Sequence, residues 1–240
     1  MGTLEDILNC PCKRFEPMTD AAPIMEAYRE ARARGAREGF TPILLPAGDE
    51  RFSEMFTWEG NNPPEKYRQE LLAQPLEDGA AYLARRLKEY REDYEAEGFS
   101  WPGDEPGEMA GGEASDTFAG IFDYGRPRKT VPLILAEIPV KNPWEVFAWI
   151  PFGGWNECPA PEEQMVMAKY WYEKYGAVPA VITMDVLEYS LPAPVKREEA
   201  MALAQEQYVF CMDIVDQGCE SVGLLADILS KSTTWFFWWD

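Results

Sequence analysis

The chain has 240 residues, a net charge of −20 and no histidine. Without histidine there is no Ser-His-Asp or Cys-His nucleophile system, no histidine general base and no histidine metal ligand. The negative charge repels nucleic acid and anionic membranes, so we expect neither as a partner, whereas it attracts cationic partners. We interpret the charge first as a device for solubility, and a dedicated basic protein partner is the alternative.

The cysteines indicate a reducing compartment. Their number is odd, they are scattered along the chain, and the first residues do not predict a secretory leader. The five are Cys10, Cys12, Cys158, Cys211 and Cys219. No apolar run approaches the ~20 residues of a membrane-spanning helix. We therefore expect a cytoplasmic protein with reduced thiols. Residues 1–20 read as a loose lead-in with a Cys-Pro-Cys turn, which lacks the further soft ligands a metal site needs.

Residues 1–97 form a helix-rich N-terminal part in our prediction. Helical spacing predicts a helix over residues 21–38 that ends at Gly39, a short helix over 65–73 and an amphipathic helix over 76–94. We expect the last of these to pack one face on a sheet. The segment 41–46 is a short strand between two prolines, which favours an edge position or strand ends.

The composition changes after residue 97. Residues 98–130 are rich in glycine, proline and acid and predict a linker or a long loop. Residues 131–240 hold seven of the nine tryptophans and predict an aromatic-rich core domain. The aromatic run at the C-terminus, TTWFFWWD, indicates a buried terminal strand.

The predicted fold class is α+β, with a central, largely antiparallel or mixed sheet flanked by helices. Apolar runs and alternation predict strands over residues 131–140, 145–152, 178–191 and 234–239. Helical spacing predicts helices that follow the prolines at 159 and 161, over 196–211 and over 221–230.

Long motifs in this second part carry a family resemblance. They read NPWEVFAWIPFGGWNECP, AKYWYEKYGAVPAVITMDVLEYSLP, ALAQEQYVFCMDIVDQG and WFFWWD. Residues 131–240 resemble the bacterial family named domain of unknown function 4253, and the N-terminal part is similar in a less specific way. The resemblance implies a histidine at the position of Met184 in many members, so its absence argues against a histidine-dependent function in this chain. It implies no activity, cofactor or partner.

Two groups of residues are candidates for a binding site. The first is Trp155, Asn156 and Glu157, which follow Gly153-Gly154, because a glycine turn at a strand end presents side chains and backbone N–H groups. A tight turn closed by a core tryptophan is the alternative. The second is Asp185 and Glu188, whose carboxylates could serve acid–base chemistry or hold a hard cation.

These candidates lead to two hypotheses for function. The first is a protein-interaction module with an acidic surface, in one version an immunity-type protein that neutralises a basic toxin. The second is a carboxylate-based, metal-assisted hydrolase in which Glu157, Asp185 and Glu188 converge on one pocket. Residues 185 and 188 face opposite sides of a regular strand, so the second needs a bulge between them. We expect no cofactor and no bound metal, and the sequence assigns neither catalytic residues nor an oligomeric state.

Overall fold

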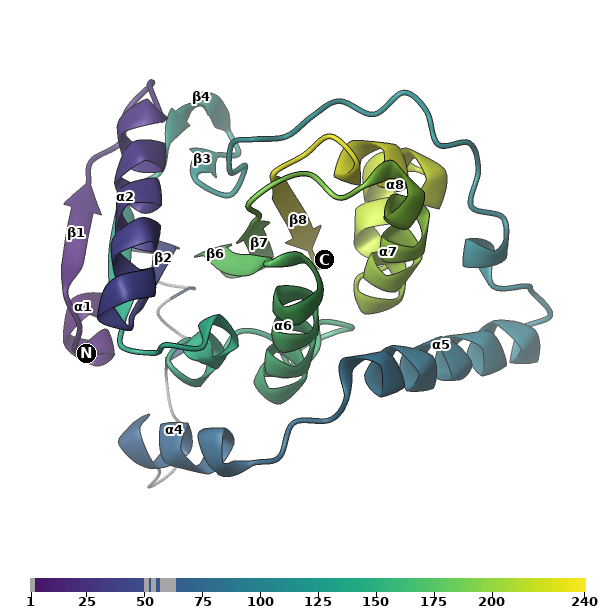
Figure 1. The fold of residues 1–240 in the computed structure, drawn as a ribbon, viewed down its shortest axis with the longest axis horizontal. Helices are drawn as coiled ribbons and strands as arrows, with labels where there is room; N and C mark the ends of the chain where they lie inside the picture. Colours follow the sequence, from purple (N-terminus) through teal and green to yellow (C-terminus); the bar gives the residue numbers. More distant parts are fainter. Residues whose placement is uncertain (1–2, 50–51, 53–54, 57–63) are drawn as a thin grey trace.

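A computed structural model describes residues 3–49, 52, 55–56 and 64–240 (Figure 1). Its main element is a mixed six-stranded sheet in the order β1-β5-β2-β6-β7-β8. The strands are β1 (Cys12–Phe15), β2 (Thr41–Pro46), β5 (Leu133–Ile138), β6 (Val178–Ile182), β7 (Val186–Ser190) and β8 (Thr234–Trp238). A separate hairpin joins β3 (Phe122–Asp123) to β4 (Arg126–Thr130). The predicted α+β class with a flanked, mixed sheet is confirmed.

Helices flank the sheet, and the N-terminal part is the more helical one, as predicted. They are α1 (Leu4–Leu8), α2 (Ala22–Glu38), α4 (Pro64–Ala73), α5 (Gly79–Ala96), α6 (Pro161–Tyr175), α7 (Arg197–Phe210) and α8 (Val222–Leu229). Shorter segments are the 3₁₀ helices η1 (Pro102–Asp104) and η2 (Pro143–Ala148) and the π-helical η3 (Ile214–Cys219). None of the helices in the described part of the chain is long and apolar enough to cross a membrane.

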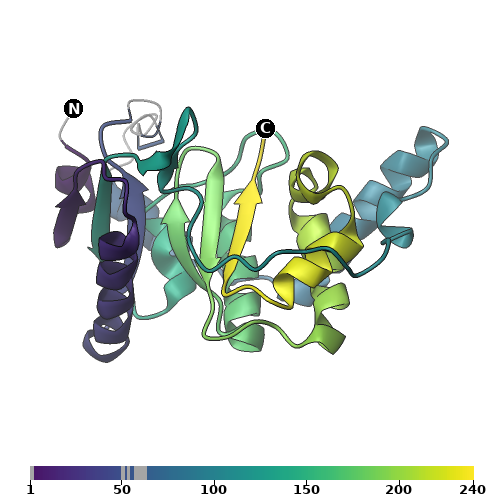
Figure 2. The ribbon, with the colours of Figure 1, turned by 90° about the horizontal axis from the view of Figure 1, so that it is seen from above.

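The two faces of the sheet bury different cores because side chains alternate along each strand. In β5, Ile134 and Ala136 face a large core that also contains residues of α5, α6, α7 and α8. Leu133 and Leu135 face a smaller core on the other side, which includes α2 and Phe118. All pairings in the sheet are antiparallel except β2 with β6. The sheet is therefore a layer between α2 on one face and most of the helices on the other (Figure 2).

The terminal aromatic run forms a strand, β8, as predicted, and this strand pairs with β7. Trp235, Phe237 and Trp239 are buried on the side of the large core, whereas Phe236 points the other way and is 42% exposed. Trp171 of α6 stacks on Phe237 at 5.4 Å and meets Trp235 edge to face at 5.7 Å. The last strand thus closes the large core against α6.

The predicted strand over residues 145–152 is wrong, because η2 occupies its first part. Pro143 stands at the first helical position, where its fixed φ favours a helical turn. The side chain of Asn142 donates to Glu145 at 2.9 Å, and the backbone N–H of Glu145 donates to the Asn142 carbonyl at 3.0 Å. Val146 and Phe147 are fully buried. A run that is buried on all sides has no periodicity, so its apolar residues could not distinguish strand from helix.

The N-terminal expectations need two further corrections. Residues 1–20 are not only a loose lead-in, since α1 begins with a capping box between Thr3 and Asp6 and β1 is an edge strand paired with β5. The strand over residues 41–46 lies inside the sheet between β5 and β6, not at its edge. Its prolines, Pro42 and Pro46, lie at or next to its ends, as the alternative expectation had it.

The segment 98–121 crosses from the end of α5 to β3 over α8 and β8 (Figures 1 and 2). It contains little regular structure besides η1. Side chains and backbone of the C-terminal elements hold it along this path: Ser232 accepts from the N–H of Ser115 at 2.9 Å, and Asp227 accepts from the N–H of Gly112 at 2.8 Å. Strands from residues 12–46 and from residues 133–238 share one sheet, so both parts of the chain contribute to the same core.

Two neighbouring residues of β8 test the role of the terminal strand. We expect Trp235→Ala to lower the free energy of unfolding by about 3–5 kcal/mol, because it opens a cavity beside Trp171. Phe236→Ala should cost less than about 1 kcal/mol, because that ring is 42% exposed. Urea unfolding of both variants measures the difference. Equal losses would contradict the assignment of β8 as a core strand.

Candidate functional site

The predicted glycine turn exists and depends on its first glycine. Gly153 and Gly154 have φ angles of 101° and 84°. A Cβ atom on Gly153 would lie 1.9 Å from the carbonyl oxygen of Pro159, which no side chain allows. The N–H of Gly154 donates to the Cys158 carbonyl at 3.1 Å and closes the loop. Residues 153–158 therefore form a tight turn between η2 and α6.

The three predicted residues of this turn point in three directions. Trp155 is half-buried and meets Phe152 edge to face at 6.2 Å. The side-chain amide of Asn156 donates to the backbone carbonyl of Asp240 at 2.6 Å. Glu157 accepts from Arg86 at 3.1 Å. The turn is thus fixed to the core, to the C-terminal residue and to α5.

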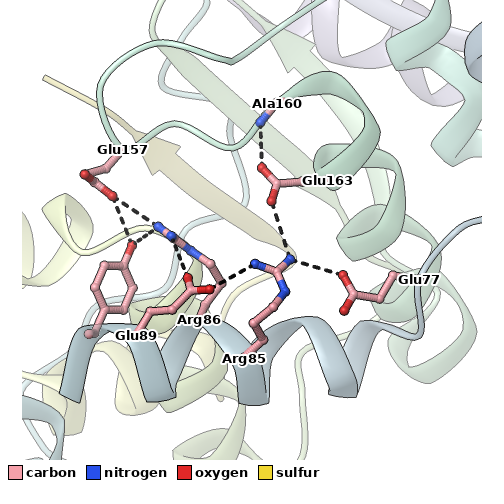
Figure 3. A network of polar contacts seen from close by, with 8 residues as sticks. Glu77, Arg85, Arg86, Glu89, Glu157, Ala160 and Glu163 are labelled. Atoms are coloured by element: carbon pink, nitrogen blue, oxygen red, sulfur yellow. Dashed lines mark hydrogen bonds and ion pairs between the residues drawn. The ribbon is translucent and has the colours of Figure 1, made fainter. Parts of the chain in front are cut away.

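Glu157 belongs to a network of ion pairs that joins α5 to the start of α6 (Figure 3). Arg86 binds Glu89 and Glu157, each at 3.1 Å, and its guanidinium lies 4.6 Å from the centre of the Tyr90 ring. The neighbouring Arg85 binds a second set of carboxylates, from Glu77, Glu89 and Glu163.

Glu163 has a second role in this network. It also accepts the backbone N–H of Ala160 at 3.0 Å and so caps α6. The two arginines bind four carboxylates, and each carboxylate of the network has an ion pair. This geometry suits bracing of α5 against the turn more than catalysis.

Asp185 lies apart from this network. It is exposed, and its carboxylate accepts from the Thr183 hydroxyl at 3.0 Å and from the indole N–H of Trp238 at 3.3 Å. These contacts close the β6–β7 turn and join it to the end of β8.

Glu188 lies on the side of β7 that faces away from the large core, and it is buried under the segment 98–121. Its two carboxylate oxygens accept the backbone N–H groups of Ala119 and Gly120 at 2.7 and 2.9 Å. Within the described residues it has no ion pair with a lysine or arginine. Burial raises the pKa of Glu188 to about 7, and the two N–H donors lower it in part. The carboxyl group anchors the crossing segment to the sheet.

The five predicted residues do not form one site. Glu157, Asp185 and Glu188 bind different partners on α5, on the β6–β7 turn and in the crossing segment. Residues 186–188 of β7 pair in regular register with β8, Glu188 with Phe236. The bulge that would turn the carboxylates of Asp185 and Glu188 to one side is therefore absent from these residues. Among residues 3–49, 52, 55–56 and 64–240, no group of three or more Cys, Asp or Glu side chains is placed to hold a metal ion. The pocket on which the hydrolase hypothesis depended is absent from this part of the chain.

A groove between α5 and α7 was not expected from the sequence. Its volume is about 250 Å³, and Leu83, Leu87, Trp101, Tyr208 and Val209 form its apolar wall. The Trp101 ring stacks between Tyr90 at 5.5 Å and Tyr208 at 4.9 Å. The helix α5 therefore packs against α6 and α7, not on a sheet as predicted. The apolar spacing of α5 identified the buried face, but it did not identify what covers that face.

The most distinctive surface, also missed, is the end of α5 with the loop that follows, residues 92–108. We call it the acidic tip. It holds seven acidic residues and no basic one. Glu92 pairs with Lys88 at 3.5 Å, and Asp104 pairs with Arg91. The other five carboxylates have no ion pair with any described residue: Asp93, Glu95, Glu97, Glu105 and Glu108.

The buried carboxyl of Glu188 makes stability depend on pH. Its pKa is higher in the folded chain than in the unfolded one. Its contribution to the free energy of unfolding is therefore complete at low pH and is lost as pH rises through about 7. Relative to Glu188→Gln, the wild type should lose on the order of 3 kcal/mol between about pH 5 and about pH 8. Urea unfolding across this range measures the difference. In Asp185→Asn, which changes an exposed carboxylate, the free energy of unfolding should depend on pH as it does in the wild type. If the pH profile of Glu188→Gln ran parallel to those of both proteins, the buried role of Glu188 would be refuted.

The comparisons with known proteins concern the second part of the chain. Residues 134–240 match the family model described as Domain of unknown function (DUF4253). Neither the curated proteins nor the solved structures give a significant match. The resemblance stated from the motifs of residues 131–240 is therefore confirmed, and the matched DUF4253 region contains the Gly153–Cys158 turn, Asp185 and Glu188.

Proposed function

We propose that the protein is an interaction module that binds a basic protein partner through the acidic tip. The supporting observation is the cluster of five carboxylates there without ion pairs. An unpaired, exposed carboxylate keeps its full charge for a partner, whereas a carboxylate already paired has to exchange one cation for another.

The position of the acidic tip favours contact with a large partner. The far end of α5 extends beyond the rest of the molecule (Figure 2), and residues 95–100 are all exposed. Tyr94 and Trp101, which meet edge to face at 5.5 Å, hold the loop against the helix. The carboxylates are thus displayed on a supported helix end, which reduces the ordering cost of binding.

Phe99 adds an apolar contact in the middle of the acidic tip. Its side chain is 66% exposed, and its backbone N–H donates to the Tyr94 carbonyl at 2.8 Å, so its position is fixed at the helix end. Aromatic residues surrounded by charged ones are typical of the energetic centre of protein interfaces. We therefore assign Phe99 as the central apolar contact and the carboxylates as the charged rim.

A finer version of the proposal is an immunity-type role, in which the acidic tip covers the basic surface of a toxin. A negative field speeds encounter with a cationic protein, which suits a neutralising role. The gene order around this chain bears on this version directly, because an immunity protein is encoded beside its toxin.

Charge reversal tests the proposed surface. The probes are the purified products of the two genes that flank the gene for this chain, titrated calorimetrically against it. We expect one product to bind, and its affinity to fall at least about tenfold between about 50 mM and about 300 mM salt. Asp93→Lys, Glu95→Lys and Glu97→Lys together should weaken binding by at least about tenfold at low salt.

The matched control is the triple variant Glu16→Lys, Glu26→Lys and Glu30→Lys, which changes the net charge equally at exposed positions on and before α2. It should weaken binding less than about threefold. If both triple variants lost affinity equally, the effect would come from net charge alone, and the assignment of the acidic tip as the binding surface would be wrong. Binding to neither gene product would contradict the proposal.

A further inference from the structure

We propose that Cys10 and Cys12 are a redox site that forms a reversible disulfide by exchange with a low-molecular-weight disulfide. This inference is independent of the proposed function. Both thiols are half-buried, so a small reagent can reach them. They lie at the junction of α1 and β1, on the far side of the molecule from the acidic tip (Figure 1).

The backbone brings the two thiols together. Only Pro11 separates the cysteines, so their Cα atoms are at most roughly 7 Å apart, near the upper end of the range in disulfides. The Cys12 thiol donates to the carbonyl of Cys10 at 3.4 Å, so the Cys12 side chain folds back over residue 10. Closure of the disulfide requires rotation of both side chains and Cα atoms no more than about 7 Å apart.

Both flanks of this turn are held in place. On one side, Asn9 takes a φ of 49° and its N–H donates to the Glu5 carbonyl at 2.9 Å, which ends α1. On the other, the carbonyl of Pro11 accepts from the N–H of Glu137 at 2.9 Å, and Cys12 pairs with Ala136 of β5. Fixed flanks keep the two sulfurs near each other and favour ring closure over two separate adducts.

The surroundings separate the roles of the two thiols. The interaction between the two thiols lowers the pKa of the Cys12 thiol and raises that of the Cys10 thiol, which burial raises further. Arg14 also favours the Cys12 thiolate, while the carboxylates of Glu5 and Glu137 oppose it. Cys12 is therefore the attacking thiol and Cys10 the resolving one.

Arg68 supplies a positive charge to Cys10. Its Nη2 donates to the Ile7 carbonyl at 3.3 Å, and its guanidinium lies 4.9 Å from the centre of the Trp149 ring. Its Nε is buried and has no hydrogen-bond partner among the residues that the structure describes. The guanidinium thus favours the anionic form of Cys10, which that thiol must reach in the second step.

The reaction proceeds in two balanced steps. The Cys12 thiolate attacks one sulfur of glutathione disulfide, forms a mixed disulfide and releases one glutathione thiolate. Cys10 then loses its proton and attacks the Cys12 sulfur, which forms the Cys10–Cys12 bond and releases the second glutathione. The two protein thiols are oxidised and one glutathione disulfide is reduced to two glutathione molecules.

The other cysteines differ from this pair. Cys158 and Cys211 are buried, and burial raises the pKa of both thiols. Cys219 is half-buried but has no neighbouring thiol, and its sulfur donates to the Ser221 carbonyl at 3.5 Å. Cys219→Ser is therefore the matched control.

The test treats the full chain with glutathione disulfide, blocks remaining thiols and digests with trypsin. Lys13 is the first basic residue, so both cysteines fall in the peptide of residues 1–13. In the wild type and in Cys219→Ser we expect this peptide to lose two hydrogen atoms and to regain them on reduction. Cys10→Ser should instead accumulate one glutathione on Cys12, and Cys12→Ser should react at least about tenfold more slowly.

The inference is overturned if the wild-type peptide stays a dithiol under conditions that modify Cys219, if it carries two glutathiones, or if either cysteine bonds to another part of the chain. Equal reaction rates of the two single variants would overturn the assignment of roles. Circular dichroism shows whether each variant folds. If either variant fails to fold, the wild-type result decides by itself.

Discussion

The aromatic cluster around Trp171 is the interaction on which the rest of the structure depends. Its ring meets Tyr189, Phe210, Trp235 and Phe237, which belong to β7, α7 and β8. Most of these contacts are edge to face, the geometry that the charge distribution of aromatic rings favours. A single side chain of α6 thus connects two strands and a second helix. The position of the C-terminus follows from this packing, and with it the hydrogen bond from Asn156 to Asp240 that holds the glycine turn.

Charge has two different roles along α5. In its first half, Arg85 and Arg86 form ion pairs with the carboxylates around them and join the helix to the turn and to α6 (Figure 3). In its second half, four carboxylates outnumber two cations, and Asp93 and Glu95 have no ion pair among the described residues. The first half therefore fixes the helix on the body of the protein, and the second half remains available for a partner. This division explains how a chain of net charge −20 can hold a long, exposed helix in one place.

Local signals in the sequence predicted much of the fold but little of the site. Gly39 and Gly176 end α2 and α6 in the left-handed conformation that such glycines favour. The sequence predicts a strand over residues 145–152, where the structure has η2. Burial on all sides removes the periodicity that would distinguish a helical turn from a strand. The prediction of the glycine turn is confirmed, because it rests on neighbouring residues. The predicted convergence of Glu157, Asp185 and Glu188 is wrong, because it depended on contacts between residues far apart in the chain. Net charge, likewise, does not reveal which carboxylates already have partners, so the acidic tip became visible only in three dimensions.

Hydrogen exchange on the native protein tests the central claim, that stability is concentrated at the aromatic cluster while the acidic tip is an outlying part. Amides of β7 and β8 that pair in the sheet, such as those of Leu187 and Phe237, should exchange only through global unfolding. Amides in the last turn of α5 should exchange through local opening, with a free energy smaller by several kcal/mol. Equal protection at both places, or faster exchange in β8 than at the end of α5, would contradict this account.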